Sequence, residues 1–211
     1  MDKKSLKHHF DDLSSKYDEQ SSKAIPYVME VANDISGMLK EATRILDVGC
    51  STGFHASILT KATSASDVVG VDFSSRMVTI AHRNCGKHCK VSLLTADIEN
   101  LPFKDECFEG VSCCFVINLL SGFHEALPEM RRVLAKGGKF IVADVETSEE
   151  QRTVRNYLLP VHPRIKGMRK PIDFSQMGEI LEKFDFSVNN AKKYQFSLRD
   201  AKLYVIEASK L

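Results

Sequence analysis

The sequence has no tryptophan, no long hydrophobic run and almost no net charge. Its 211 residues include 29 Lys+Arg and 28 Asp+Glu, a formal net charge of +1, so no overall field favours nucleic acid or an anionic membrane. No run of about 18 apolar residues is present that could span a bilayer. The segment from Met1 to Asp12 lacks the apolar core of a secretory signal. These absences predict a cytoplasmic protein without a membrane span, for which nucleic acid is a disfavoured partner.

The 6 cysteines do not have the spacing of a disulfide-stapled protein. Cys113 and Cys114 are adjacent in an apolar run that indicates a buried strand, where reduced cysteines pack as small apolar residues. Four side chains of metal-binding type are close in the sequence: His82, Cys85, His88 and Cys89. Because no C-x-x-C pair or second cluster accompanies them, we predict no metal site.

Short apolar runs alternate with segments of helical periodicity up to residue 142. The runs that indicate strands cover residues 44–48, 67–72, 91–96, 111–117 and 139–142. The segments that indicate helices cover residues 22–41, 53–62, 74–84 and 120–134, and the last helix is expected to end at Gly137-Gly138. Repeated strand–helix units imply right-handed crossovers, and therefore an α/β fold with a parallel sheet and helices on both faces.

The pattern changes beyond residue 143. Asp173 and Gln176 are spaced as a capping pair at the start of a helix, and two closely spaced strands over 186–196 and 202–208 predict an antiparallel hairpin. We interpret residues 1–211 as a single domain with four parts: N-terminal helices (1–41), a ligand-binding core (43–143), a variable polar segment (144–172), and a C-terminal helix and hairpin (173–211).

A glycine turn follows the first strand, in the segment Ile45–Gly53. Gly49 lets the backbone approach a ligand closely, and the next helix presents free N–H groups. Asp72 ends the second strand, where a carboxylate can accept hydrogen bonds from both ribose hydroxyls, and Asp97 follows the third strand, where it can reach an adenine amino group. Each acid alone is equally explained as a turn former. Together with Asp47, which ends the first strand, they predict a nucleoside-shaped slot.

A dinucleotide cofactor is the first alternative ligand for this turn. Its fingerprint requires three glycines in the pattern G-x-G-x-x-G. The corresponding positions hold Gly49, Ser51 and Phe54, so two of the three do not match. Asp47, just ahead of the turn, would repel a pyrophosphate but suits an ammonium group. A ligand with a nucleoside at one end and an amino acid at the other therefore fits better.

Four segments together resemble the class I S-adenosylmethionine-dependent methyltransferases, most closely the small-molecule methyltransferases of ubiquinone and menaquinone biosynthesis. They cover residues 45–53, 69–77, 96–103 and 131–138. The resemblance implies a Rossmann-like, doubly wound sheet of seven strands, mostly parallel with one antiparallel strand near the C-terminus. It also implies S-adenosylmethionine as cofactor. The N-terminal segment around Phe10 and Tyr17-Asp18 is more loosely similar to the N-terminal lid of that family.

The resemblance also implies a role for each matching residue. Asp47 would orient the methionyl ammonium, and Gly49, Ser51 and Gly53 would form the close-approach turn. Asp72 would bind the ribose. The remaining residues would surround the adenine and the methionyl arm: Phe73 and Met77 against the adenine ring, Asp97 and Ile98 at its edge, and the Cys114 carbonyl near the ammonium.

The sequence does not single out a catalytic base, because methyl transfer from a sulfonium mainly requires an aligned nucleophile and the exclusion of water. His55, His124 and His162 are candidates, and each is also explained as a surface or capping histidine. The segment Cys114–Ile117 lacks the Asn/Asp-Pro-Pro-Tyr/Phe tetrapeptide typical of exocyclic-amine methylation. This absence favours a small-molecule acceptor over a DNA base.

The basic side chains of residues 144–172 leave two interpretations open. They suit an anionic acceptor, such as a carboxylate or phosphate, but they are more typical of a solvated basic loop. Methyl transfer to a small molecule is the function that the sequence favours. The alternatives are a nicotinamide-dependent oxidoreductase and a non-catalytic protein that binds S-adenosylmethionine, and an RNA acceptor is less favoured.

Overall fold

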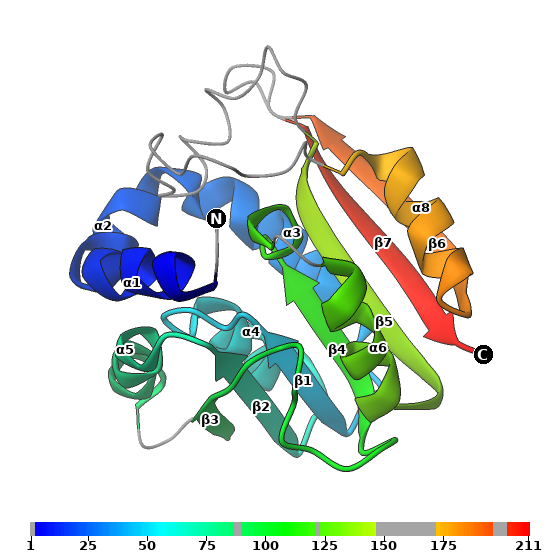
Figure 1. Cartoon of the computed structure of the whole chain (residues 1–211), viewed down its shortest axis with the longest axis horizontal. Helices are drawn as coiled ribbons and strands as arrows, with labels where there is room; N and C mark the ends of the chain where they lie inside the picture. The colour runs from blue at the N-terminus through cyan, green and yellow to red at the C-terminus, as the bar shows by residue number, and fades with distance from the viewer. Residues whose placement is uncertain (1–2, 87–89, 121–122, 147–171, 196–201) are drawn as a thin grey trace.

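A computed structural model describes residues 3–86, 90–120, 123–146, 172–195 and 202–211. Its centre is a seven-stranded sheet with the strand order β3-β2-β1-β4-β5-β7-β6 (Figure 1). The strands are β1 (Arg44–Val48), β2 (Asp67–Asp72), β3 (Val91–Thr95), β4 (Phe108–Cys114), β5 (Leu134–Glu146), β6 (Phe186–Gln195) and β7 (Lys202–Lys210). The helices are α1 (Lys3–Leu13), α2 (Tyr17–Ser21), α3 (Ile25–Met38), α4 (Phe54–Ala62), α5 (Ser75–Cys85), α6 (Phe123–Val133) and α8 (Phe174–Lys183). Short 3-10 turns are η1 (Ser14–Lys16), η2 (Ser22–Ala24) and η3 (Ile117–Leu119). None of the helices in these ranges is long and apolar enough to cross a membrane.

The strand directions confirm the predicted doubly wound fold. β1 to β5 pair with one another in parallel, whereas β7 is antiparallel to both of its neighbours, β5 and β6. The residues that connect β6 to β7 lie outside the described ranges, but the predicted antiparallel pairing of these strands is confirmed. The carboxyl ends of β1, β2 and β4 face the N-terminal helices α1, α2 and α3 (Figure 1).

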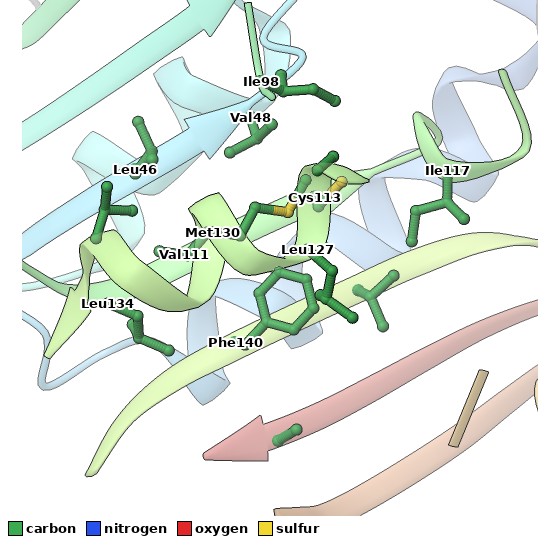
Figure 2. Packing of buried hydrophobic residues seen from close by; sticks show 14 of the residues in the cluster. Leu46, Val48, Ile98, Val111, Cys113, Ile117, Leu127, Met130, Leu134 and Phe140 are labelled. Atoms are coloured by element: carbon green, nitrogen blue, oxygen red, sulfur yellow. The ribbon is translucent and has the colours of Figure 1, made fainter. Parts of the chain in front are cut away.

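The sheet is buried on both faces, and successive residues of β1 face opposite sides of it. Ile45 packs in a cluster with Ile35 of α3, whereas Leu46 packs in another with Leu127 and Met130 of α6 (Figure 2). None of these five side chains is more than 1% exposed. Coverage of both faces explains why β1, β2 and β4 are buried at nearly every position rather than at alternate ones.

Several predicted boundaries are wrong: β5 is much longer than residues 139–142, β4 begins before residue 111, and α3 is shorter than residues 22–41. Two further differences have a clear physical reason. β4 was expected to reach residue 117, but it ends at Cys114 because Phe115 adopts a left-handed conformation (φ 60°). Helix α6 was expected to continue to Gly137-Gly138, but it ends at Val133. The next residue, Leu134, pairs with Phe108 of β4, so the chain joins the sheet there instead of continuing the helix.

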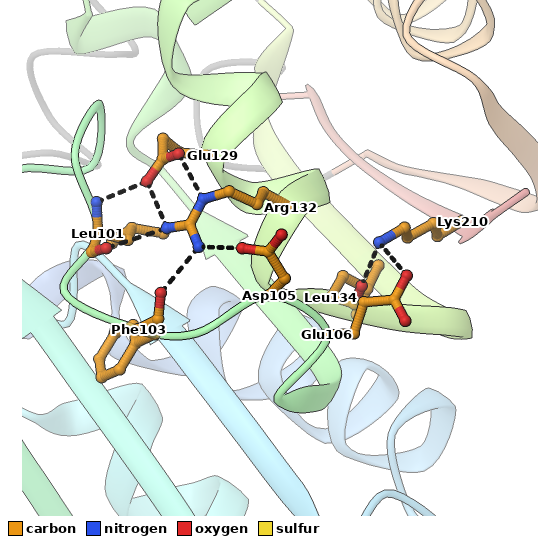
Figure 3. A network of polar contacts seen from close by, with 8 residues as sticks. All are labelled: Leu101, Phe103, Asp105, Glu106, Glu129, Arg132, Leu134 and Lys210. Atoms are coloured by element: carbon orange, nitrogen blue, oxygen red, sulfur yellow. Dashed lines mark hydrogen bonds and ion pairs between the residues drawn. The ribbon is translucent and has the colours of Figure 1, made fainter.

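Arg132 of α6 fixes the loop that follows β3 (Figure 3). Its guanidinium donates to the carbonyl oxygens of Leu101 (3.0 Å) and Phe103 (2.8 Å) and to the carboxylates of Glu129 (2.6 and 2.8 Å) and Asp105 (2.7 Å). The planar fork of arginine serves all of these acceptors at once, which a lysine ammonium cannot do. This network holds the segment after Asp97 against α6.

We expect Arg132→Ala to lower the free energy of unfolding by about 1.5–3 kcal/mol, the range for charge-assisted hydrogen bonds that are lost from one partner. The matched control is Lys40→Ala, which removes a surface ion pair with Glu41 at 3.7 Å and should cost at most about 1 kcal/mol. Urea denaturation of both variants measures the difference. Equal losses in the two variants would contradict a structural role for the Arg132 network.

Candidate ligand-binding site

A cavity of about 720 Å³ lies at the carboxyl ends of β1, β2 and β4. Its walls come from α1, α2 and α3, from the turn after β1, and from the residues that follow β2, β3 and β4. The cofactor-binding residues predicted from the sequence line it, except Met77: Asp47, Gly49, Ser51, Gly53, Asp72, Phe73, Asp97, Ile98 and Cys114. The sheet topology therefore brings together side chains that are distant in the sequence.

The turn after β1 is built from residues in the left-handed region. Gly49, Ser51 and Gly53 have φ values of 74°, 48° and 86°. The N–H groups of Gly49 and Cys50 both donate to the carbonyl oxygen of Val71, at 2.8 and 2.9 Å, which anchors the turn to β2. Gly49 must lack a side chain, because a Cβ there would lie 2.2 Å from the Val116 side chain. Gly53 then begins α4.

Asp72 lies at the end of β2 and is 6% exposed. Its two carboxylate oxygens accept from the backbone N–H groups of Ser51 (3.0 Å) and Ser74 (2.9 Å). Burial raises the pKa of Asp72 to about 6; the two N–H groups oppose this rise, and the negative charge of Asp47 adds to it. Each oxygen keeps a further lone pair, so Asp72 can still accept hydrogen bonds from a ligand.

Asp47 lies at the end of β1 and is also buried. Its Oδ1 accepts from the Ser112 hydroxyl (3.0 Å) and lies 2.9 Å from Nδ1 of His55. Its Oδ2 is shielded from water and has no hydrogen-bond partner among the described residues. An unpaired buried carboxylate oxygen fits the ammonium group of an amino-acid ligand, so the residues present suit the cofactor that the resemblance implies.

Asp97 and Ile98 follow β3, and Ile98 is buried. The Asp97 carboxylate accepts from the ammonium of Lys3 at 2.8 Å, and Lys3 also pairs with Glu99. Burial opposes the charged form, but Lys3 and the Glu99 N–H outweigh it and lower the pKa of Asp97. The N-terminal helix thus contacts the acid that is expected to bind the adenine edge.

Three further contacts hold α1 and α2 over the cavity. Ser74, which caps α5 as predicted, donates from its hydroxyl to Asp11. The Thr52 hydroxyl and the Asn84 amide donate to Asp18 at 2.6 and 3.0 Å. These contacts join the N-terminal helices to the glycine turn and to α5. Sequence reasoning treated this segment only as a loosely similar lid and missed Lys3 as a site residue.

The other predicted residues lie elsewhere. Met77 packs in a buried cluster with Leu6 and Phe10 instead of lining the cavity. Its sulfur accepts a hydrogen bond from the Ser51 hydroxyl at 3.7 Å, and this contact stabilises the glycine turn after β1. His124 is stacked on Phe184, with ring centroids 5.9 Å apart, and does not line the cavity.

The predicted absence of a metal site remains a prediction for the whole chain. His82 is exposed and Cys85 is buried, so their side chains do not converge. His88, Cys89 and the candidate base His162 lie outside the described residues. Within the ranges that the structure describes, no group of three or more His, Cys, Asp or Glu residues could hold a metal ion.

Gly53→Ala is expected to lower the free energy of unfolding by more than about 1 kcal/mol, because an L-residue is strained at positive φ. The φ of Gly53 is +86°, and an added Cβ would lie 2.8 Å from the Cys85 sulfur. Gly37→Ala is the matched control. A Cβ there meets nothing within 4 Å, and a helical alanine should stabilise the protein by about 0.5–1 kcal/mol. Urea denaturation should give effects of opposite sign; effects of the same sign would refute this account of the turn.

Asp72 should make the ligand-free protein less stable as the pH rises from about 4 to about 6. The pKa of its carboxyl is about 6 in the folded protein, against an ordinary value of 3.8, so folding favours the protonated form. Its contribution is fully present below the unfolded pKa and is lost as the pH passes the folded pKa. Asp72→Asn should lack this component in urea denaturation at pH 4 to 7. An identical pH dependence in both proteins would contradict the prediction.

Comparison with known sequences supports the resemblance. A family model described as a methyltransferase domain matches residues 45–138. A demethylmenaquinone methyltransferase of Thermus thermophilus is 37% identical over 106 residues, which are 50% of this chain and 48% of that protein. A protein of the same name from Clavibacter sepedonicus is 30% identical over 158 residues, or 70% of this chain and 61% of that protein. The chain thus spans about half to three fifths of the length of these relatives.

Solved structures share the fold at low sequence identity. A putative methyltransferase in complex with the Trm112 methyltransferase activator of Haloferax volcanii has a TM-score of 0.74 at 17% identity, covering 96% of this chain and 98% of that one. A SAM-dependent methyltransferase from Aquifex aeolicus has a TM-score of 0.65 at 22% identity, covering 82% and 85%. The cyclase SpnF has a TM-score of 0.68 at 19% identity, covering 86% and 80%. The fold alone therefore does not decide the reaction.

The matching sequence segments, the fold and the cavity at the ends of the parallel strands agree with one another. Residues 45–138 match a family model described as a methyltransferase domain, and they lie within a fold that solved SAM-dependent methyltransferases share.

Proposed function

We propose that this protein transfers a methyl group from S-adenosylmethionine to a small acceptor with a largely apolar body. The observation that carries the proposal is the make-up of the cavity. Part of its lining is the glycine turn and the strand-end acids, which we assign to a polar end, and part is apolar side chains, which we assign to an apolar end. The two ends belong to the same cavity, as a methyl donor and its acceptor require.

The polar end suits the donor. Asp72 would accept hydrogen bonds from the ribose hydroxyls, and Asp97 with Ile98 would contact the adenine edge. Gly49 would leave room for the sulfur-bearing arm, and Asp47 Oδ2 would accept from the methionyl ammonium. A pyrophosphate would face the buried charge of Asp47, so the nicotinamide-dependent alternative is not favoured.

The apolar end suits the acceptor. It is formed by α3 and by the residues that follow β4, chiefly Ile25, Val28, Val31, Phe115 and Leu119. Side chains of this kind exclude water and hold an apolar ligand by its surface area. The curated relatives are named for demethylmenaquinone, and a ring compound of that kind would match such a lining.

The predicted anionic character of the acceptor has less support. It rests on the basic residues of 144–172, all of which lie outside the described ranges. Lys3, Lys4 and Lys7 line the cavity, and two of the three are paired: Lys3 with Asp97 and Glu99, and Lys7 with Asp11. The ammonium groups of Lys3 and Lys7 are therefore already matched by carboxylates. An anionic group on the acceptor stays a prediction, as does a cytoplasmic location.

The chemistry requires little of the protein beyond alignment. When bound, S-adenosylmethionine supplies a methyl group already activated on a sulfonium. The residues of this chain would then hold the acceptor in line with the carbon–sulfur bond and keep water away. Among the described histidines, His55 is paired with Asp47 and His124 lies outside the cavity. An acceptor that is ionised before transfer needs no base.

Calorimetric titration with S-adenosylhomocysteine tests the donor half of the proposal. Asp72→Ala should bind it about 10–100-fold more weakly, because hydrogen bonds to a charged acceptor are lost. Asp67→Ala is the control, since Asp67 begins the same strand and pairs with Arg44 at 2.9 Å, away from the cavity. No binding by the unaltered protein at high micromolar concentration would remove the proposal, and so would unchanged affinity in folded Asp72→Ala.

Transfer of labelled methyl groups tests the acceptor half. A panel of apolar ring compounds, polar metabolites and RNA would be incubated with the protein and labelled S-adenosylmethionine. Turnover is expected only with the apolar compounds. Binding of the donor without turnover on any member would favour the non-catalytic alternative, and turnover confined to RNA would contradict a small acceptor.

A further inference from the structure

Phe115 has a backbone conformation that large side chains rarely adopt. Its φ is +60°, in the left-handed region, where an L-residue other than glycine is strained and a bulky one is an outlier. The strain is confined to this residue. Cys114 before it still pairs with Ala143 of β5, and Val116 after it returns to the right-handed region (φ −109°, ψ −38°). Strain of this kind persists only where the surrounding structure holds it, and it is concentrated at functional sites.

The residues on both sides hold Phe115 in this conformation. Its N–H group donates to the carbonyl oxygen of Ala143 at 2.8 Å, which keeps the end of β4 attached to β5. On the other side, Val116 packs against the glycine turn, with a methyl carbon 2.2 Å from where a Cβ on Gly49 would lie. The chain then enters η3, where the Leu119 N–H donates to the Val116 carbonyl oxygen at 2.9 Å. The backbone is therefore fixed before and after Phe115.

The left-handed residue brings three consecutive residues to one cavity, which Cys114, Phe115 and Val116 all line. In a strand that continued, successive side chains would point to opposite faces of the sheet, and Phe115 would lie on the face opposite to its two neighbours. Instead, the half-buried Phe115 side chain packs against the apolar cluster that includes Val31 and Ile35 of α3. Both of these α3 residues line the same cavity. The strained backbone thus brings an aromatic ring to the apolar end of the cavity.

We infer that Phe115 is a specificity-determining residue of the acceptor end, where its ring offers a flat face to a planar acceptor. This inference rests on the proposed function and deepens it. The other four side chains assigned above to the apolar end are aliphatic: Ile25, Val28, Val31 and Leu119. Aliphatic side chains hold an apolar ligand by its buried area, whereas an aromatic ring adds a stacked or edge-to-face contact with another flat ring. Phe115 thereby favours a planar ligand over a puckered one of similar apolar area.

The test compares two probes that share a carbon skeleton and differ in flatness. 2-Naphthol is planar, and 2-decalol is its saturated, puckered counterpart with the same hydroxyl position. Their affinities would be measured by calorimetry with saturating S-adenosylhomocysteine, for the unaltered protein and three variants. Phe115→Leu keeps an apolar side chain and the strained backbone but removes the flat face, whereas Phe115→Tyr keeps the flat face. Phe184→Leu is the matched control, because Phe184 is also half-buried and lies outside the cavity.

The affinity ratio of 2-naphthol to 2-decalol should fall by about 2–10-fold in Phe115→Leu, the range for one aromatic contact beyond its buried area. It should stay unchanged in Phe115→Tyr and in Phe184→Leu. An unchanged ratio in Phe115→Leu would overturn the inference, since equal weakening of both probes is the effect of a structural role. The same fall in Phe184→Leu would overturn it too, as would binding of neither probe by the unaltered complex. Failure of the unaltered protein to bind S-adenosylhomocysteine would instead remove the proposed function itself.

Urea denaturation tests the backbone part of the inference without any ligand. Phe115→Gly and Phe115→Ala both remove the ring, but only alanine is strained at positive φ. Phe115→Gly should therefore unfold at a higher urea midpoint than Phe115→Ala. The opposite order, which is usual inside a strand or helix, would show that the chain does not hold this residue in the left-handed region, and it would overturn the inference.

Discussion

The structure depends on keeping two carboxylates, Asp47 and Asp72, buried at the ends of adjacent parallel strands. Burial of a charged carboxylate is unfavourable and raises the pKa of Asp72, and the like charge of Asp47 adds to this rise. The surrounding chain offsets it with directed donors: backbone N–H groups reach Asp72, while Ser112 and His55 reach Asp47. A run of left-handed residues after β1 brings Ser51 to Asp72. The buried charge of Asp72 therefore depends on the conformation of the turn, which supplies one of its hydrogen-bond donors.

The N-terminal helices complete the site from the other side. They contact the residues around the cavity through polar groups. Lys3 forms an ion pair with Asp97, Asp11 accepts a hydrogen bond from Ser74, and Asp18 accepts one from Thr52. The same helices and α3 supply the apolar part of the cavity. The N-terminal helices therefore contribute both polar and apolar residues to the lining of the cavity.

Local signals in the sequence predicted most of the fold and the polar half of the site. The strands that end in Asp47 and Asp72 are identified by short apolar runs, and parallel topology alone brings their ends together. Features that depend on contacts between residues distant in the sequence were not predicted. α6 ends early because Leu134 pairs with Phe108, and Met77 turns away from the cavity because Leu6 and Phe10 cover it. The contact of His55 with Asp47 and the place of α3 in the cavity wall became clear only from tertiary contacts.

The central claim is that the strand-end carboxylates hold an adenosyl amino acid across the glycine turn. A crystal structure of the protein with S-adenosylhomocysteine tests it most directly. The account predicts both ribose hydroxyls on Asp72 and the ammonium on Asp47, with the arm passing over Gly49. A complex in which this crevice is empty, or in which the compound binds elsewhere on the chain, would contradict it.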